Sequence, residues 1–194
     1  ITLISLISFS TILKAVEQTW TDWEKVKYSP LEFEDIGDLI GNGSFEHWYS
    51  EGKLDAGKKG EQYWIQNYTD KGFIIMEYLA MPPGWVIGGS GNDKKYIIRK
   101  SGYLLNTNNP PLDRIKKRDI QRFRDIHNNV VPYVYFNYEG SSCLIFKKGY
   151  FKNSSGYVAS AQDSETLVGI FCQNSGTIDE IFAQQLINSM KLKK

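Results

Sequence analysis

Histidine is the side chain most often used for acid–base chemistry at neutral pH, and the chain has two, His47 and His127. Neither belongs to a metal-binding motif such as His-Glu-x-x-His. Glu46 precedes His47 in a predicted strand, where successive side chains point to opposite faces, so this pair does not converge on one ion. We therefore assign no catalytic residue, expect no metal or cofactor, and favour a protein that is not an enzyme. A hydrolase whose residues converge only in the fold, with His47 or His127 beside a carboxylate, stays the alternative.

A glycine-rich segment comes close to two functional motifs and completes neither. Gly88-Gly89-Ser90-Gly91-Asn92 lacks the final glycine of a nucleophile elbow. Gly89 to Lys94 lacks the Gly-Lys-Ser/Thr ending of a phosphate-binding loop. We expect an exposed hairpin loop over 88–93.

Aromatic side chains concentrate between residues 48 and 85. They are Trp48, Tyr49, Tyr63, Trp64, Tyr68, Tyr78 and Trp85. Exposed rings of this kind can stack on sugars, peptides or bases, but the core of a sheet uses the same residues for packing. The sequence favours packing, and the candidates for a binding surface are Trp48, Trp64 and Trp85.

A basic group is a second candidate for binding. It comprises Arg114, Lys117, Arg118 and Arg124. These residues could meet phosphate groups or anionic lipid, but Asp113, Asp119 and Asp125 dilute the charge, which favours an ordinary solvated surface. The whole chain has 23 Lys and Arg against 22 Asp and Glu, a net charge of +1. No overall field would attract nucleic acid, and we expect no nucleic-acid partner.

The N-terminal segment is apolar. Residues Ile1 to Leu13 contain no charge, and the small residue Ala15 follows. A membrane span needs about 20 apolar residues, so the run is too short, and it resembles the apolar part of a signal peptide. We predict a signal peptide over 1–15, a mature chain that begins near Val16, and no stable membrane span after its removal. An amphipathic helix packed on the body is the alternative.

The region 16–110 is predicted to hold one helix and an antiparallel β-meander. Ser29-Pro30-Leu31-Glu32 forms a capping box, which predicts a helix that ends at Gly41-Asn42-Gly43. Short β-type runs separated by turn residues follow it. They are Phe45 to Tyr49, Gln62 to Tyr68, Phe73 to Leu79, Trp85 to Ile87 and Tyr96 to Ile98. Asp70-Lys71-Gly72 is the clearest hairpin turn among them.

The region 111–194 is predicted to hold a helix and a three-stranded sheet covered by a C-terminal helix. Apolar residues recur on one face from Leu112 to His127, which predicts the first helix. The predicted strands are Val130 to Tyr138, Cys143 to Phe146 and Leu167 to Cys172, and the capping box Thr177-Ile178-Asp179-Glu180 opens the last helix. The fold class is therefore α+β: an antiparallel aromatic-rich meander followed by a small antiparallel sheet covered by a C-terminal helix. Whether the two regions form one domain or two is left open.

Cys143 and Cys172 are the only cysteines. In an exported protein one pairing is possible, and antiparallel strands would place the two residues at the same end. We predict a disulfide worth about 3–4 kcal/mol in the chain-entropy model. Two buried free thiols are the alternative.

The stretch 143–194 resembles the ending of uncharacterised exported proteins from alphaproteobacteria. The residues that carry this resemblance are Cys143-Leu144-Ile145-Phe146, Leu167-Val168-Gly169-Ile170-Phe171-Cys172, Ser175-Gly176 and the terminal helix. Those proteins commonly have two aromatic residues before the second cysteine, whereas Ile170 replaces the first of them here. The resemblance implies export and brings no known activity. We expect a periplasmic or secreted protein with a non-catalytic binding or interaction role, whose partner is an envelope protein or a small ligand.

Overall fold

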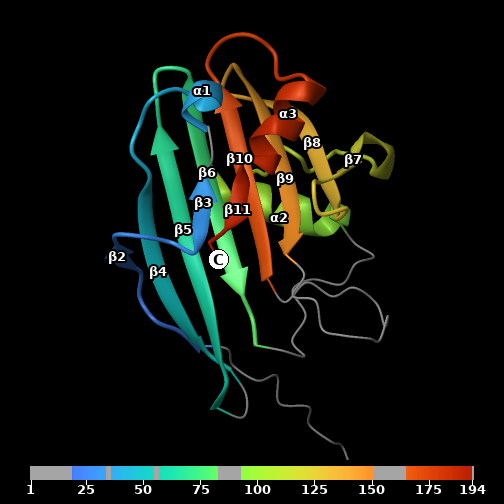
Figure 1. Cartoon of the computed structure of the whole chain (residues 1–194). Helices are drawn as coiled ribbons and strands as arrows, with labels where there is room; N and C mark the ends of the chain where they lie inside the picture. The colour runs from blue at the N-terminus through green and yellow to red at the C-terminus, as the bar shows by residue number, and fades with distance from the viewer. Residues whose placement is uncertain (1–18, 34–35, 55–56, 83–92, 151–164, 194) are drawn as a thin grey trace, which may run out of the picture.

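The computed structural model describes residues 19–33, 36–54, 57–82, 93–150 and 165–193. The predicted signal peptide, the predicted strand from Trp85 to Ile87 and the glycines of the 88–92 segment lie outside these ranges. The described chain forms one large antiparallel sheet with further elements packed on both of its faces (Figure 1).

The large sheet has nine strands in the order β1-β4-β5-β6-β10-β9-β8-β7, with β2 paired to β4 beside this path. The strands are β1 (Thr19–Trp20), β2 (Glu24–Val26), β4 (Glu46–Lys53), β5 (Lys59–Tyr68), β6 (Gly72–Ala80), β7 (Gln121–Arg124), β8 (Val130–Tyr138), β9 (Ser141–Tyr150) and β10 (Glu165–Gln173). The predicted α+β class and the predicted hairpins of the meander, β4 to β6, are confirmed.

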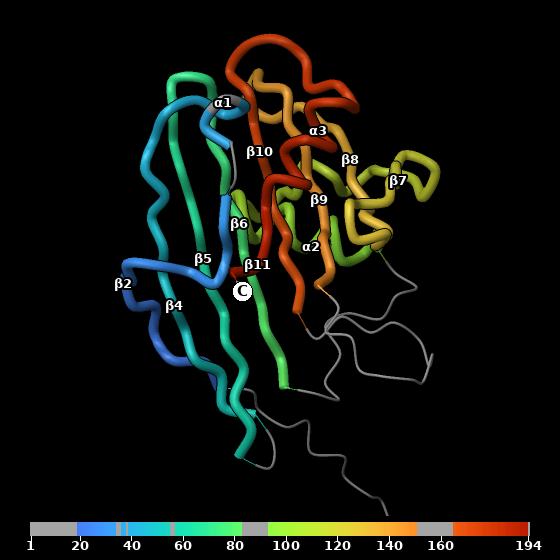
Figure 2. Tube along the Cα trace, in the orientation of Figure 1, coloured from blue at the N-terminus to red at the C-terminus, as the bar shows by residue number. Residues whose placement is uncertain are grey.

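The predicted C-terminal sheet does not stand apart from the meander. β10 pairs with β9 on one side and with β6 on the other, from Gly72 opposite Gln173 to Ala80 opposite Glu165. Figure 2 shows β10 between β6 and β9, two strands that precede it in the sequence. Both halves of the sequence therefore share a continuous sheet.

Side chains alternate along each strand and so divide the core between two faces of the sheet. One face carries Ile65, Met76 and Phe171 and is covered by α1 (Ile36–Ile40), α3 (Glu180–Asn188) and a two-stranded sheet of β3 (Leu31–Phe33) and β11 (Met190–Leu192). We call it the closed face. The other carries Trp64, Ile75 and Val168 and is covered by α2 (Asp93–Leu104), which lies behind the sheet in Figure 1. We call it the open face.

The predicted disulfide is confirmed. Cys143 on β9 and Cys172 on β10 are directly opposed, bonded and buried, with their Cα atoms 4.1 Å apart. By sequence the bond spans the polar segment 152–164, which lies outside the described residues. No helix within the described ranges combines the length and apolar character needed to cross a membrane.

The helix predicted from the capping box at Ser29 is wrong in its first half. Leu31 to Phe33 form strand β3, which pairs with β11, and only Ile36–Ile40 is helical. The Ser29 hydroxyl accepts from the amide of Leu31, two residues on, instead of capping a helical turn. Pairing with the distant C-terminus buries Leu31 to 2% exposure, which outweighs the local capping signal.

Two other predicted elements are also wrong in type. The run Tyr96 to Ile98, predicted as a strand, lies within α2, because a short apolar run does not distinguish a strand from a buried helical turn. The segment from Leu112 to His127, predicted as a helix, forms turns, the 3-10 helix η2 (Lys117–Asp119) and the edge strand β7. Phe123 pairs there with Val131 on β8, a contact that its own segment does not encode.

The predicted C-terminal helix is present with shifted ends. Asp179, not Thr177, is its N-cap and accepts from the amide of Phe182 at 2.7 Å. The sequence places Lys191, Lys193 and Lys194 near its C-terminal end, where they would complement the helix dipole, but Lys191 lies beyond the helix in β11. Lys148 of β9 takes that place: its ammonium, buried beneath α3, donates to the carbonyls of Ile187 at 2.9 Å and Met190 at 2.7 Å.

Candidate functional site

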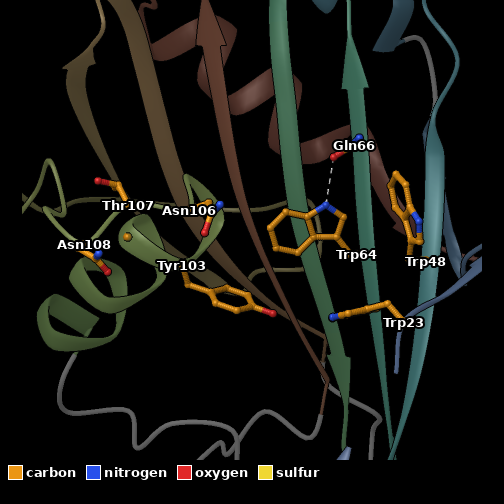
Figure 3. A pocket seen from close by; sticks show the side chains of 9 residues that line it. Trp23, Trp48, Trp64, Gln66, Tyr103, Asn106, Thr107 and Asn108 are labelled. Atoms are coloured by element: carbon orange, nitrogen blue, oxygen red, sulfur yellow. Dashed lines mark hydrogen bonds between the residues drawn. The ribbon is translucent and has the colours of Figure 1, made fainter. Parts of the chain in front are cut away.

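An open pocket of about 610 Å³ lies on the open face, between the sheet and the end of α2. Its walls come from four places in the chain and are shown in Figure 3. The lining residues are Trp23, Trp48, Trp64, Gln66, Gly102, Tyr103, Asn106, Thr107 and Asn108. Three of the five tryptophans of the chain meet here.

The floor of the pocket comes from β4 and β5. Trp48 and Trp64 are directly opposed across these two strands, so both indoles stand on the same face of the sheet. Gln66 follows Trp64 by two residues and therefore shares that face, next to the tryptophan. The alternation of side chains within β5 and its register with β4 together make these three side chains neighbours.

Trp23 and Tyr103 flank Trp64 on either side. The Trp23 ring lies 6.4 Å from that of Trp64 at 69°, and the Tyr103 ring lies 5.6 Å from it at 81°. These are edge-to-face contacts, a favoured arrangement for aromatic pairs. Trp23 remains 40% exposed and Tyr103 44% exposed. The pocket therefore offers aromatic surface to a ligand while its rings hold one another in place.

A hydrogen-bonded chain sets the position of the Trp64 indole. Its Nε1 donates to Gln66 Oε1 at 3.2 Å, Gln66 Nε2 donates to Glu46 Oε2 at 3.2 Å, and Lys25 Nζ donates to Glu46 Oε1 at 2.7 Å. The hydrogen bond from Lys25 is the main reason that the pKa of Glu46 lies below its ordinary value. The Lys25 ammonium also lies 5.7 Å from the centre of the Trp48 ring. One chain of contacts thus fixes both tryptophans of the floor.

A buried carboxylate supports the α2 side. Glu77 on β6 is 2% exposed, and one of its oxygens accepts from Gln62 while the other accepts from Lys100 of α2. The Lys100 ammonium lies 4.8 Å from the centre of the Tyr103 ring. Burial first, and then the negative charge of Glu77, raise the pKa of Tyr103. Tyr103 therefore stays neutral at physiological pH and its ring is tied to the sheet through Lys100.

The rim beyond Tyr103 is built by the way α2 ends. The amide of Thr107 donates to the carbonyl of Gly102 at 2.9 Å and the amide of Asn106 donates to that of Tyr103 at 3.2 Å, the two bonds of a Schellman motif. Asn106 takes the left-handed position with φ of 49°. Gly102 allows a close approach here, because a Cβ at this position would lie 3.0 Å from Pro110 Cγ and 3.1 Å from the Thr107 carbonyl oxygen, both tight contacts.

This helix end presents three polar side chains to the pocket. The side-chain amides of Asn106 and Asn108 form no hydrogen bond with the described part of the chain, and the Thr107 hydroxyl accepts from the backbone amide of Asn109 at 3.2 Å. No protein-family model, curated protein or solved structure matches the chain. What the pocket can bind is therefore argued from its own groups.

The structure brings together two of the three predicted aromatic candidates. Trp48 and Trp64 line the pocket, and Trp85 lies outside the described residues. Trp23 and Tyr103 were missed, because the sequence does not reveal which distant segments face β5. The polar run that starts at Asn106 carried a usable signal, since three side chains able to bind hydroxyls follow one another there.

The two histidines do not converge. His47 lies on β4 with its side chain on the closed face, opposite Ile65, and its buried Nδ1 has no hydrogen-bond partner in the described structure. Burial, and then the charge of Lys193, lower its pKa. His127 lies exposed in the turn after β7, at the other side of the sheet, and no ion pair joins either histidine to a described carboxylate.

The basic residues predicted on one helix face do not form a common surface. Arg114 and Arg118 each lie 3.9 Å from the aspartate next to them in the chain. Arg124 donates to the backbone carbonyl of Asn128 at 3.0 Å within the β7–β8 turn. Searching the described residues for a cluster of three or more His, Cys, Asp or Glu able to hold a metal ion finds none.

Proposed function

We propose that the protein is an exported periplasmic or envelope protein that binds a small ligand in the aromatic pocket without transforming it. The observation that carries this proposal is the convergence of Trp23, Trp48, Trp64 and Tyr103 on one open pocket. Concave sites lined mainly by apolar and aromatic groups with a few placed polar groups are the usual form of small-molecule sites, and their volumes run from about 300 to 1,000 Å³. The volume of this pocket, about 610 Å³, lies within that range.

The order of the pocket supports a binding role. Its aromatic rings are held by edge contacts and by the hydrogen bonds of Gln66 and Glu46, yet two of them keep large exposed fractions. A preorganised site loses little conformational entropy when a ligand arrives. Aromatic rings that are held in place but exposed to water gain free energy when a ligand covers them.

The lining favours binding over catalysis. Acid–base catalysis needs a group whose pKa lies near the working pH, and the only titratable side chain in the lining is Tyr103, whose pKa is raised. The carboxylates of Glu46 and Glu77 are not among the lining residues, and each is paired with a lysine. The hydrolase alternative has no histidine in this pocket.

Export is supported by the Cys143–Cys172 disulfide, by the apolar leader and by the resemblance of the C-terminal stretch. N-terminal sequencing of protein from the native host tests it, with a start near Val16 expected. Non-reducing peptide mapping of the same sample should recover the two cysteines in one linked peptide. A chain that retains its first thirteen residues and carries alkylatable thiols would contradict export.

The binding role is tested by a thermal-shift screen of neutral sugars, amino acids, nucleotides and quaternary amines. A ligand present at about 100 times its Kd should raise the Tm by about 5 °C. We expect at least one such shift, reduced by about half in Trp23→Ala, as a tenfold weaker Kd implies, and kept in Tyr28→Ala. Tyr28 is a matched control, because it is 63% exposed and lies outside the pocket. A screen in which no compound depends on Trp23 would remove the proposal.

A further inference from the structure

We infer that the ligand of the aromatic pocket is a neutral carbohydrate, a short oligosaccharide. This inference rests on the proposed binding function and names its ligand class. It follows from four properties of the lining: exposed ring faces, side chains that both donate and accept hydrogen bonds, cations that are already paired, and ring faces that already hold a cation.

The rings suit the faces of a sugar. A pyranose ring presents C–H groups on its faces and hydroxyls at its edge, so an apolar flat surface covers the face and leaves the edge free. Trp23 and Tyr103 supply such surfaces, since both are about half exposed and stand edge-on to Trp64 instead of stacking on it. Figure 3 shows Trp23 and Tyr103 reaching Trp64 from different parts of the chain, so that both border the same pocket.

The polar groups suit the edge of a sugar. Asn106, Thr107, Asn108 and Gln66 carry amides and a hydroxyl, which donate and accept at the same time, as sugar hydroxyls do. The side-chain amides of Asn106 and Asn108 have no partner in the described part of the chain and are free to bind. Gln66 is already bonded on both sides and serves to orient Trp64.

An anionic ligand is disfavoured. The lining contains no Lys or Arg, and the lysines nearest to it, Lys25 and Lys100, are paired with Glu46 and Glu77. A phosphate or carboxylate group gains most from a cation that donates charge-assisted hydrogen bonds to it. Nucleotides, which could use the rings for base stacking, would leave their phosphates unmatched here.

A cationic ligand is disfavoured for a different reason. Four aromatic residues around one pocket suggest a cage for a quaternary ammonium group. Two of the four rings already have an ammonium near their faces, Lys25 at Trp48 and Lys100 at Tyr103. A further cation would meet two like charges, so a neutral ligand fits best.

Isothermal titration calorimetry on the full-length mature protein tests the inference. The probes are cellotetraose, chitotetraose and maltotetraose as neutral sugars, AMP as an anion and choline as a cation. We expect at least one tetrasaccharide to bind with a Kd that is unchanged between low and high salt, because no ion pair forms. Trp23→Ala and Asn108→Ala should each weaken this binding by about tenfold.

Matched variants serve as controls. Tyr28→Ala removes an exposed aromatic and Asn42→Ala an exposed amide away from the pocket, and neither should change the Kd. Thermal melts of all four variants check that each is folded. Tetrasaccharide binding that survives Trp23→Ala would place the sugar elsewhere and overturn the inference.

The remaining outcomes separate the ligand class from the binding role. If AMP or choline binds in a Trp23-dependent way and no tetrasaccharide does, the carbohydrate assignment is wrong and the proposed binding function stands. If neither these probes nor the broader screen gives any Trp23-dependent binding, both fall together.

Discussion

The two faces of the large sheet treat their polar groups in different ways. On the closed face, polar side chains are enclosed by the fold: Tyr78 donates to Glu165 at 2.9 Å, and Lys148 and Tyr150 donate to the carbonyl of Met190, while the buried His47 Nδ1 has no partner in the described structure. On the open face, the exposed side chains of Asn106 and Asn108 border a pocket. The polar groups of the closed face are thus shut off from solvent, whereas those at the pocket stay accessible to a ligand.

The coverage of the two faces explains this division. The closed face is shielded by two helices and a small sheet, whereas α2 covers the open face only over its central strands and ends at Leu104, beside β5. Trp48 and Trp64 lie on the strands beyond it. The pocket therefore lies where α2 ends and leaves the neighbouring strands uncovered by the described helices, and changes on each face should have separable effects.

The largest expected effect comes from the centre of the sheet. The double variant Cys143→Ala/Cys172→Ala should lower the free energy of unfolding by about 3 kcal/mol, because it releases a cross-link between residues 29 apart in the chain. Ligand binding should persist, since neither cysteine lines the pocket. Urea denaturation, with reduced wild-type protein as a second measure, checks the value. A loss of binding in a folded double variant would contradict the separation of core and pocket.

The next effect is confined to the closed face. Lys148 is 1% exposed and donates to two carbonyls at the end of α3, so Lys148→Met should lower the free energy of unfolding by about 2 kcal/mol, because Ile187 and Met190 both lose this donor, although Tyr150 still donates to Met190. Denaturation at pH 7 measures the loss. Lys193→Met is the control, because Lys193 donates to the carbonyl of Ser29 at 2.8 Å from a less buried position and should cost less.

A pH dependence follows from the same lysine. Burial lowers the pKa of Lys148 to about 8, with Asp125 opposing and Lys191 adding to the decrease. Between this pKa and that of the unfolded chain, the unfolded state binds more protons, so stability from this group rises with pH. The wild type should therefore gain about 1 kcal/mol over Lys148→Met from pH 8 to pH 9. Equal slopes for the two proteins would refute this assignment.

The smallest effect on stability belongs to the pocket. Trp23→Ala should change the free energy of unfolding by no more than about 0.5 kcal/mol, since the side chain is 40% exposed and its ring meets that of Trp64 at 69° without stacking on it. The same variant should weaken ligand binding by about tenfold. A destabilisation as large as that of Lys148→Met would mean that Trp23 stabilises the fold as much as a buried residue does, and that pocket and core are not separable.

The sequence predicted the parts of the fold that depend on local pattern. The runs that became β5, β6 and β10 alternate or continue in apolar character between clear turns, and Cys143 and Cys172 had only each other to bond. It failed where a distant strand decided the outcome. Leu31 is a strand residue only because β11 lies beside it, and the 112–127 segment extends only because β8 offers an edge.

The sequence likewise predicted only part of the site. Trp48 and Trp64 stood out because tryptophans on neighbouring strands are conspicuous in the sequence, and the register places them together. Trp23 and Tyr103 join them through the path of the N-terminal segment and the position of α2, neither of which follows from the local sequence. Register and helix placement, more than residue type, turned an aromatic composition into a pocket.

The position of β10 has a consequence for how the chain reaches this form. β10 inserts between β6 and β9, and its last residue, Gln173, pairs with Gly72 of β6. Until β10 is in place, the edges of β6 and β9 that face it stay unpaired. Unpaired edges of this kind invite association with other chains, and pairing over so long a separation slows folding. β10 follows both β6 and β9 in the chain, so the central pairings of the sheet form only after the segment up to Gln173 has been synthesised.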